Sequence, residues 1–178
     1  MNRKATYCLM LALLVALAGC RERTDRSEGT VILSITDFDG LPLVINASDP
    51  IVQVEEIILQ NIAKDPTGTT SDLMSIELRS YEIRFVRRDT GTRVPPALVQ
   101  GVFGLVPVGG TTTLNNLPVM MADQLLNSPL RDLARTGVDP ETGSTVILLD
   151  AYMRFFGRTL SGDDIVSDQA RFTLEIRP

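Results

Sequence analysis

The chain has 178 residues and a formal net charge of −5 at pH 7, and it contains no histidine, no tryptophan and only two cysteines. Histidine is the usual base of serine and cysteine hydrolases, so its absence excludes those mechanisms, and ordinary Cys/His zinc sites fail for the same reason. The acidic balance argues against nucleic acid as a partner, since a polyanion binder needs clustered cations.

The amino terminus has the order of a secretory leader. Arg3 and Lys4 precede an apolar run over residues 9–18, which would form a helix of about 15 Å. A bilayer core is roughly 30 Å thick, so the run is too short for a stable membrane span. Small residues then stand directly before Cys20, as at a cleavage site. We therefore expect residues 1–19 to be a signal peptide that is removed.

The run Leu17-Ala18-Gly19-Cys20 resembles the lipobox of bacterial lipoproteins. The resemblance implies cleavage between Gly19 and Cys20, a diacylglycerol on the Cys20 thiol and an acyl chain such as palmitate on the new amino group. Two or three acyl chains give durable membrane attachment, which one chain does not. Arg21 stands where an aspartate retains enteric lipoproteins at the inner membrane, so the sequence favours the outer membrane.

The mature chain divides into a tether and one domain. Residues 20–30 are polar and mixed in charge, which is typical of a flexible tether. Residues 31–178 are enough for one domain with a single core. The domain contains no cysteine, so apolar packing and backbone pairing must stabilise it without disulfides. Loss of the leader's two cations leaves fifteen Lys and Arg against twenty-two Asp and Glu, a net charge of about −7.

Strand patterns begin directly after the tether. Residues 31–36 are rich in β-branched side chains and end at a predicted turn over 37–42. Between Val52 and Leu59 the apolar alternation changes phase at Glu55 and Glu56, which predicts a β-bulge, with a short amphipathic helix as the alternative. The alternation over 74–85, with a phase slip at Ser80, predicts a long, bent strand or two connected strands.

Residues 93–108 contain a pair of prolines followed by an apolar stretch. Pro95 and Pro96 lack the main-chain donor that a central strand needs, so residues 93–108 are predicted to be a loop with a brief edge strand. The apolar part, 97–108, must be buried under the domain or offered to a partner. One or two helical turns are expected within 120–134, interrupted at Pro129.

The last third again predicts strands. Alternate residues from Ile147 to Phe155 and from Phe172 to Ile176 are apolar, and a hairpin connection is expected over 157–164. About seven or eight strands joined by polar turns predict an all-β fold, an antiparallel β-sandwich of immunoglobulin-like or fibronectin-like architecture. Residues 152–172 are similar to the last hairpin of sandwich lipoproteins of unassigned function, a resemblance that implies no functional residues.

Carboxylates are the remaining candidates for chemistry. Paired acids could serve a glycosidase, or their oxygens could hold calcium, and the candidates are Asp37, Asp39, Asp163, Asp164 and Asp168. Asp and Gly in turns usually only cap them, so no metal and no cofactor is expected. Two cations near the last hairpin, Arg154 and Arg158, are expected to pair with Asp150 or Asp163.

These patterns together predict a non-enzymatic, lipid-anchored lipoprotein of the cell envelope. It would act as a binding, scaffold or assembly module whose partner is another envelope protein, and a strand added to an exposed sheet edge is the natural contact. The alternative is a small-ligand or calcium-binding lipoprotein. A closed apolar cavity of about 300 Å³ or more with converging polar groups would favour that alternative.

Overall fold

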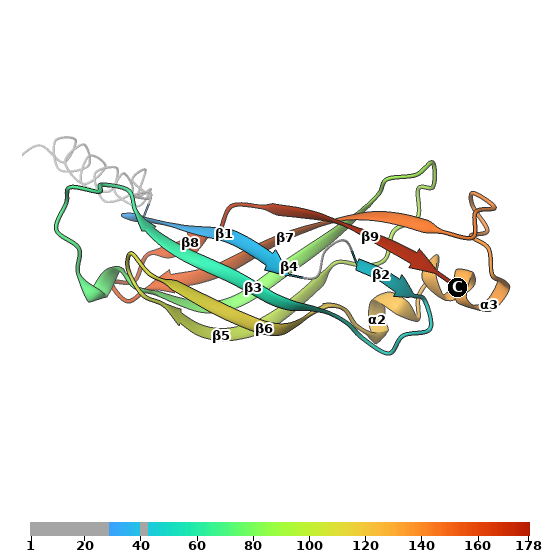
Figure 1. Ribbon diagram of the computed structural model, residues 1–178, viewed down its shortest axis with the longest axis horizontal. Helices are drawn as coiled ribbons and strands as arrows, with labels where there is room; N and C mark the ends of the chain where they lie inside the picture. Colours follow the sequence, from blue (N-terminus) through green and yellow to red (C-terminus); the bar gives the residue numbers. More distant parts are fainter. Residues whose placement is uncertain (1–28, 40–42) are drawn as a thin grey trace, which may run out of the picture.

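The computed structural model describes residues 29–39 and 43–178. The predicted signal peptide, its cleavage site at Gly19 and Cys20, and residues 21–28 of the tether lie outside the described residues. The described chain forms nine strands, one 3-10 turn and two helices (Figure 1). The strands are β1 (Val31–Asp39), β2 (Leu43–Asn46), β3 (Val52–Ala63), β4 (Ile76–Arg87), β5 (Leu98–Val106), β6 (Thr111–Met120), β7 (Ile147–Thr159), β8 (Asp164–Val166) and β9 (Ala170–Arg177). The helical segments are η1 (Asp72–Met74), α2 (Ala122–Leu125) and α3 (Leu130–Thr136).

The strands form two sheets, which confirms the all-β sandwich. One sheet has the order β1-β3-β6, and the other has the order β2-β9-β7-β4-β5 with β8 paired to β7. The strand number is nine among the described residues, above the predicted seven or eight. One pair also departs from the antiparallel prediction, because β2 runs parallel to β9. β1 and β2 belong to different sheets. In its sheet β2 is an edge strand and lies beside β9, the last strand of the chain.

The two ends of the sandwich differ. Helices α2 and α3, strand β2 and the end of β9 gather at one end, while β1 begins at the other end, near the β5–β6 connection (Figure 1). Pro129 lies between α2 and α3 and directly precedes α3, so the helical window is interrupted at this proline as predicted. Gly137 ends α3 in the left-handed conformation (φ 74°), as glycine commonly does.

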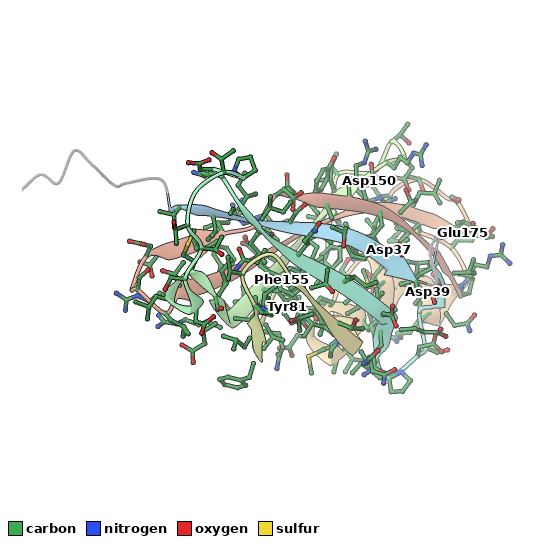
Figure 2. The ribbon with its side chains drawn as sticks, turned by 60° about the vertical axis from the view of Figure 1, so that its left-hand side comes forward. Asp37, Asp39, Tyr81, Asp150, Phe155 and Glu175 are labelled. Carbon is green, nitrogen blue, oxygen red and sulfur yellow. The ribbon has the colours of Figure 1, made fainter. Side chains whose placement is uncertain are left out.

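The core lies between the sheets and follows the predicted alternation. The alternate apolar residues predicted to face inward are all buried, namely Ile147, Leu149, Ala151, Met153 and Phe155 on β7 and Phe172, Leu174 and Ile176 on β9. The rings of Tyr81 and Phe155 lie side by side with centroids 5.7 Å apart (Figure 2). The Tyr81 hydroxyl donates a 2.7 Å hydrogen bond to the Pro118 carbonyl of the opposite sheet. Burial raises the pKa of Tyr81 to about 12.

The predicted phase changes have two different structural causes. On β4, Leu78 pairs with Gly157 and Ser80 pairs with the adjacent Phe156, so the extra residue that was predicted is present. On β3 the helix alternative is not adopted, and the β-bulge predicted at Glu55 and Glu56 is absent: the register with β6 shifts between Val52 and Gln53, where the extra residue is Val119 of β6. At Glu55 and Glu56 the alternation of inward-facing and outward-facing side chains reverses on β3, and it reverses on the paired part of β6 as well, so the register does not shift there. Within this part of β6, Asn116 has a positive φ of 53°.

Three predicted boundaries were wrong. The segment 93–108 was predicted to be mainly loop, but β5 is a nine-residue strand that begins after the two prolines. Residues 37–39 were predicted to turn, but they continue β1. The last hairpin is tighter than predicted, since β7 extends to Thr159 and leaves only residues 160–163 between it and β8. At Asp37 and at Gly157 pairing with a neighbouring strand extends β structure through residues of weak strand propensity.

Candidate functional site

The outer edge of β5 is the candidate functional site. β5 is the last strand of its sheet and pairs with β4 on one side, and no other strand of the described chain pairs with its second side. Its nine residues, LVQGVFGLV, include no charged residue and no proline. Sheets usually protect a free edge with lysine, proline or inward-pointing charge, because unpaired main-chain groups there bind other strands.

The apolar side chains of β5 divide between the two faces of the sheet. Leu98, Val102 and Val106 are buried, although the register of β5 against β4 shifts near its centre. Phe103 is 89% exposed, and Val99 is also exposed. The sequence left two alternatives for the apolar segment 97–108, burial under the domain or contact with a partner. In the structure alternate residues of β5 are buried or half-buried, and those between them face outward.

Two structural details define the accessible part of this edge. The Thr112 hydroxyl of β6 donates a 2.7 Å hydrogen bond to the Leu105 carbonyl, so β6 covers the carboxyl-terminal end of β5. At Gly101 an added Cβ would meet only the Arg79 carbonyl, at 3.9 Å. The edge that β6 leaves uncovered is therefore Leu98 to Gly104, with room for a side chain at Gly101. Its first residues, Leu98 to Gln100, also line a pocket of about 330 Å³ with Met121 to Gln124.

Beside this edge one carboxylate is bound by two guanidinium groups. Glu82 of β4 is the register partner of Val99, and its carboxylate binds Arg84 at 2.8 Å and Arg154 of β7 at 2.7 Å. The hydrogen bond from Arg84 holds the pKa of Glu82 below its usual value against the opposing effect of burial, with a further contribution from Arg154. The guanidinium of Arg154 also lies over the ring of Phe156, 5.2 Å from its centroid.

The arginine pairs near the last hairpin differ from the prediction. Arg154 was expected to pair with Asp150 or Asp163, but it pairs with Glu82 across the sheet. Arg158 donates to the Gly162 carbonyl at 2.7 Å and lies 3.7 Å from Asp164. The physical reason is register: Arg154 lies opposite Glu82 of β4, whereas Arg158, four positions later on β7, lies opposite Asp164 of β8.

The structure does not bring the calcium candidates together. Asp37 and Asp39 lie on β1 (Figure 2), whose carboxyl-terminal end points toward the helices. Asp163 and Asp164 lie at the β7–β8 turn, at the opposite end of the sandwich. In the described ranges, no group of three or more His, Cys, Asp or Glu side chains could hold a metal ion.

Asp168 instead has a structural role. Its carboxylate accepts hydrogen bonds of 2.9 Å from the Ser34 hydroxyl and from the Ile35 main-chain N–H. These bonds hold β1, the edge strand of one sheet, to the β8–β9 connection of the other.

A buried ion cluster near the helical end was not predicted from the sequence. Arg87 of β4 binds Asp89 through Nε and Oδ1 at 2.6 Å and binds Asp139 through Nη2 and Oδ2 at 2.8 Å. The side chains of Arg87 and Asp139 are only 3% and 0% exposed. Gly91 leaves the space in which the guanidinium lies, since a Cβ there would overlap it.

The cluster is satisfied internally. Asp139 also accepts hydrogen bonds from the Thr142 hydroxyl and from the main-chain N–H groups of Glu141 and Thr142. Burial by itself raises the pKa of Asp139, but the bonds from Thr142 and Arg87 outweigh it and hold the pKa below its usual value. The residues Asp89-Thr90-Gly91 signalled a turn in the sequence, but no local signal pointed to Asp139, which lies 52 positions after Arg87.

Comparisons with known proteins provide no family assignment. No family model and no curated protein matches the chain. Among solved structures, the chain is similar to the solution structure of a proposed late embryogenesis abundant (LEA) protein, with 14% sequence identity and a TM-score of 0.45 over 98% of this chain and 86% of that one. This likeness carries no argument about function. Among the described residues, no helix is long and apolar enough to cross a membrane.

Proposed function

We propose that this protein is a non-enzymatic, lipid-anchored assembly module of the bacterial envelope whose copies join through the free edges of β5. The observation that carries the proposal is an uncharged edge strand on which Phe103 is 89% exposed. The lipid anchor at Cys20 rests on the lipobox resemblance, and the outer membrane is its proposed location.

The chemistry of the edge selects the kind of strand that it can bind. Unpaired main-chain groups along an edge bind an added strand by hydrogen bonds, and alternate side chains of that strand determine specificity. A cationic side chain placed against Val99 or Phe103 would lose water without gaining an ion pair, because Glu82 is already bound by Arg84 and Arg154. An uncharged apolar strand is therefore favoured, and a second copy of β5 is such a strand.

Two copies of β5 are complementary when they pair in antiparallel fashion about Gly101. In that register each Phe103 lies opposite Val99 of the partner copy. Aromatic and β-branched residues that face each other across strands contribute roughly 0.2–1 kcal/mol relative to an alanine pair. The two Gly101 residues meet at the centre, where the absence of side chains leaves room for both rings.

The anchor favours this contact and orients it. Tethering confines copies to one surface and so raises their effective concentration. Antiparallel β5 strands place the beginnings of the two β1 strands at opposite ends of the pair. Both tethers can then reach one membrane when the pair lies along it, since residues 20–30 span at most roughly 40 Å when extended.

A cysteine at the centre of the proposed contact tests the pairing. Gly101→Cys in the lipidated full chain, reconstituted in vesicles and oxidised, is expected to give a disulfide-linked dimer. Val86→Cys is the matched control, because Val86 is exposed on the same face of β4 but not at the edge. Addition of Phe103→Lys to Gly101→Cys should abolish the crosslink by placing a charge opposite Val99.

Three results would contradict the proposal. They are equal crosslinking of the Gly101→Cys and Val86→Cys variants, no dimer from Gly101→Cys at any density in the membrane, and crosslinking in intact cells to a different envelope protein in place of a second copy.

A further inference from the structure

A groove lies at the helical end of the sandwich. It has a volume of about 540 Å³ and lies between the turn after β2 and the helices α2 and α3. Its lining includes Ala47, Pro50, Leu125, Leu126, Arg131 and Arg135. The volume falls within the usual range for small-molecule sites, roughly 300–1,000 Å³.

The floor of the groove is apolar. Ala47 and Leu125 are buried, while Leu126 is one of the most exposed large apolar residues of the described chain. Pro50 and Ala134 also line the groove without contributing side-chain polar groups. An exposed leucine beside an apolar hollow favours an apolar ligand, because a ligand there would remove both from water.

One side of the groove is cationic. Arg131 and Arg135 lie four positions apart on α3 and therefore on the same face of the helix. Arg131 has only an exposed contact with Asp132, at 3.5 Å. Within the described part of the chain, no carboxylate lies within ion-pair distance of Arg135. The one acid that lines the groove, Asp49, accepts a 3.0 Å hydrogen bond from the Asn46 main-chain N–H.

We propose that this groove binds a single-chain amphiphile with an anionic head, a carboxylate or a phosphate. The apolar chain would lie on the floor formed by Leu125 and its neighbours, and the head would meet the two guanidinium groups. Arginine suits this role because its planar fork donates two parallel hydrogen bonds to a carboxylate or phosphate. This inference is independent of the pairing at β5.

Titration calorimetry with a series of amphiphiles tests the chain contact. The protein is the full chain with Cys20→Ser, made by cell-free synthesis, so that residues 1–19 are present in every variant and their contribution is common to all. Affinity should rise about fourfold for each methylene from octanoate to dodecanoate. Dodecanol should bind at least tenfold more weakly than dodecanoate. Comparison of dodecanoate with dodecyl phosphate identifies the preferred head.

Two variants test the site itself. The double variant Arg131→Gln/Arg135→Gln should weaken dodecanoate binding at least tenfold and leave dodecanol binding unchanged. Its matched control is Arg79→Gln/Arg84→Gln, which removes the same charge from exposed positions of β4, and this control should bind like the parent. Ala134→Trp fills the groove from an exposed position of α3 and should abolish binding of every ligand without lowering the melting temperature.

The proposal is overturned if dodecanol binds as tightly as dodecanoate or if both double variants weaken binding equally. It is also overturned if Ala134→Trp retains the affinity of the parent, because the ligand would then lie elsewhere.

Discussion

Replacement of Arg87 by methionine tests whether the buried ion cluster stabilises the helical end of the domain. Methionine retains much of the apolar stem but removes the guanidinium, which binds Asp89 at 2.6 and 2.9 Å and Asp139 at 2.8 Å. Asp139 would then be a fully buried carboxylate whose remaining donors are neutral. Removal of one partner from a buried ion pair costs about 3–5 kcal/mol.

The hydrogen bonds that Asp139 keeps from Thr142 and Glu141 place the expected cost at the lower end, about 3 kcal/mol. For a domain of this size, that corresponds to a fall in melting temperature of roughly 6–12 °C. Urea unfolding followed by circular dichroism should show a lower midpoint with an unchanged slope. The matched control Arg84→Met removes an exposed guanidinium and should change the free energy of unfolding by less than about 0.5 kcal/mol.

The loss of stability caused by Arg87→Met depends on pH. Hydrogen bonds and the Arg87 charge hold the pKa values of Asp89 and Asp139 below their usual value, despite the opposing effect of burial. The stability that these carboxylates contribute is therefore present above about pH 4 and is lost as the pH falls through their lowered folded-state pKa values. The difference between the parent and Arg87→Met should shrink in the same range.

A second substitution separates buried charge from lost packing. Asp139→Asn, added to Arg87→Met, removes the unpaired charge and should recover at least about 1 kcal/mol. The reasoning is refuted if Arg87→Met costs less than about 1 kcal/mol at pH 7, or if the added Asp139→Asn lowers stability further.

Three other predictions concern single residues. Tyr81→Phe should cost about 1–3 kcal/mol at pH 7, because the Pro118 carbonyl loses its donor. The folded-state pKa of Tyr81, about 12, exceeds the usual 10, so the stability of the parent should fall as the pH rises from about 10 through 12. Urea midpoints of the variant should show no such fall. Gly157→Ala should destabilise the domain by about 1–3 kcal/mol, measured by thermal unfolding, because its Cβ would lie 2.7 Å from the Glu77 carbonyl oxygen; an unchanged melting temperature would contradict the close approach. Cys20→Ser should abolish incorporation of labelled palmitate, and label in the variant equal to that in the parent would refute the lipobox assignment.

The sequence by itself determined the strand character of the core and the face that each strand buries. Alternation over 147–155 and over 172–176 has a period of two residues, which only a half-buried strand satisfies, and the structure confirms both inward faces. The slip at Ser80 could be predicted for the same reason, because an extra residue reverses the apolar phase locally. Signals of this kind lie within a few neighbouring residues.

Only the tertiary structure decided which strands pair and what remains uncovered. The prolines before β5 predicted an edge strand, but its length and its neighbour β4 depend on the order of strands in the sheet. Arg87 meets Asp139 across 52 positions, and the groove joins a turn near Ala47 to a helix near Arg135. A single sequence carries no local signal for such contacts, because burial favours many pairings of apolar strands and only the packing of the whole chain selects one.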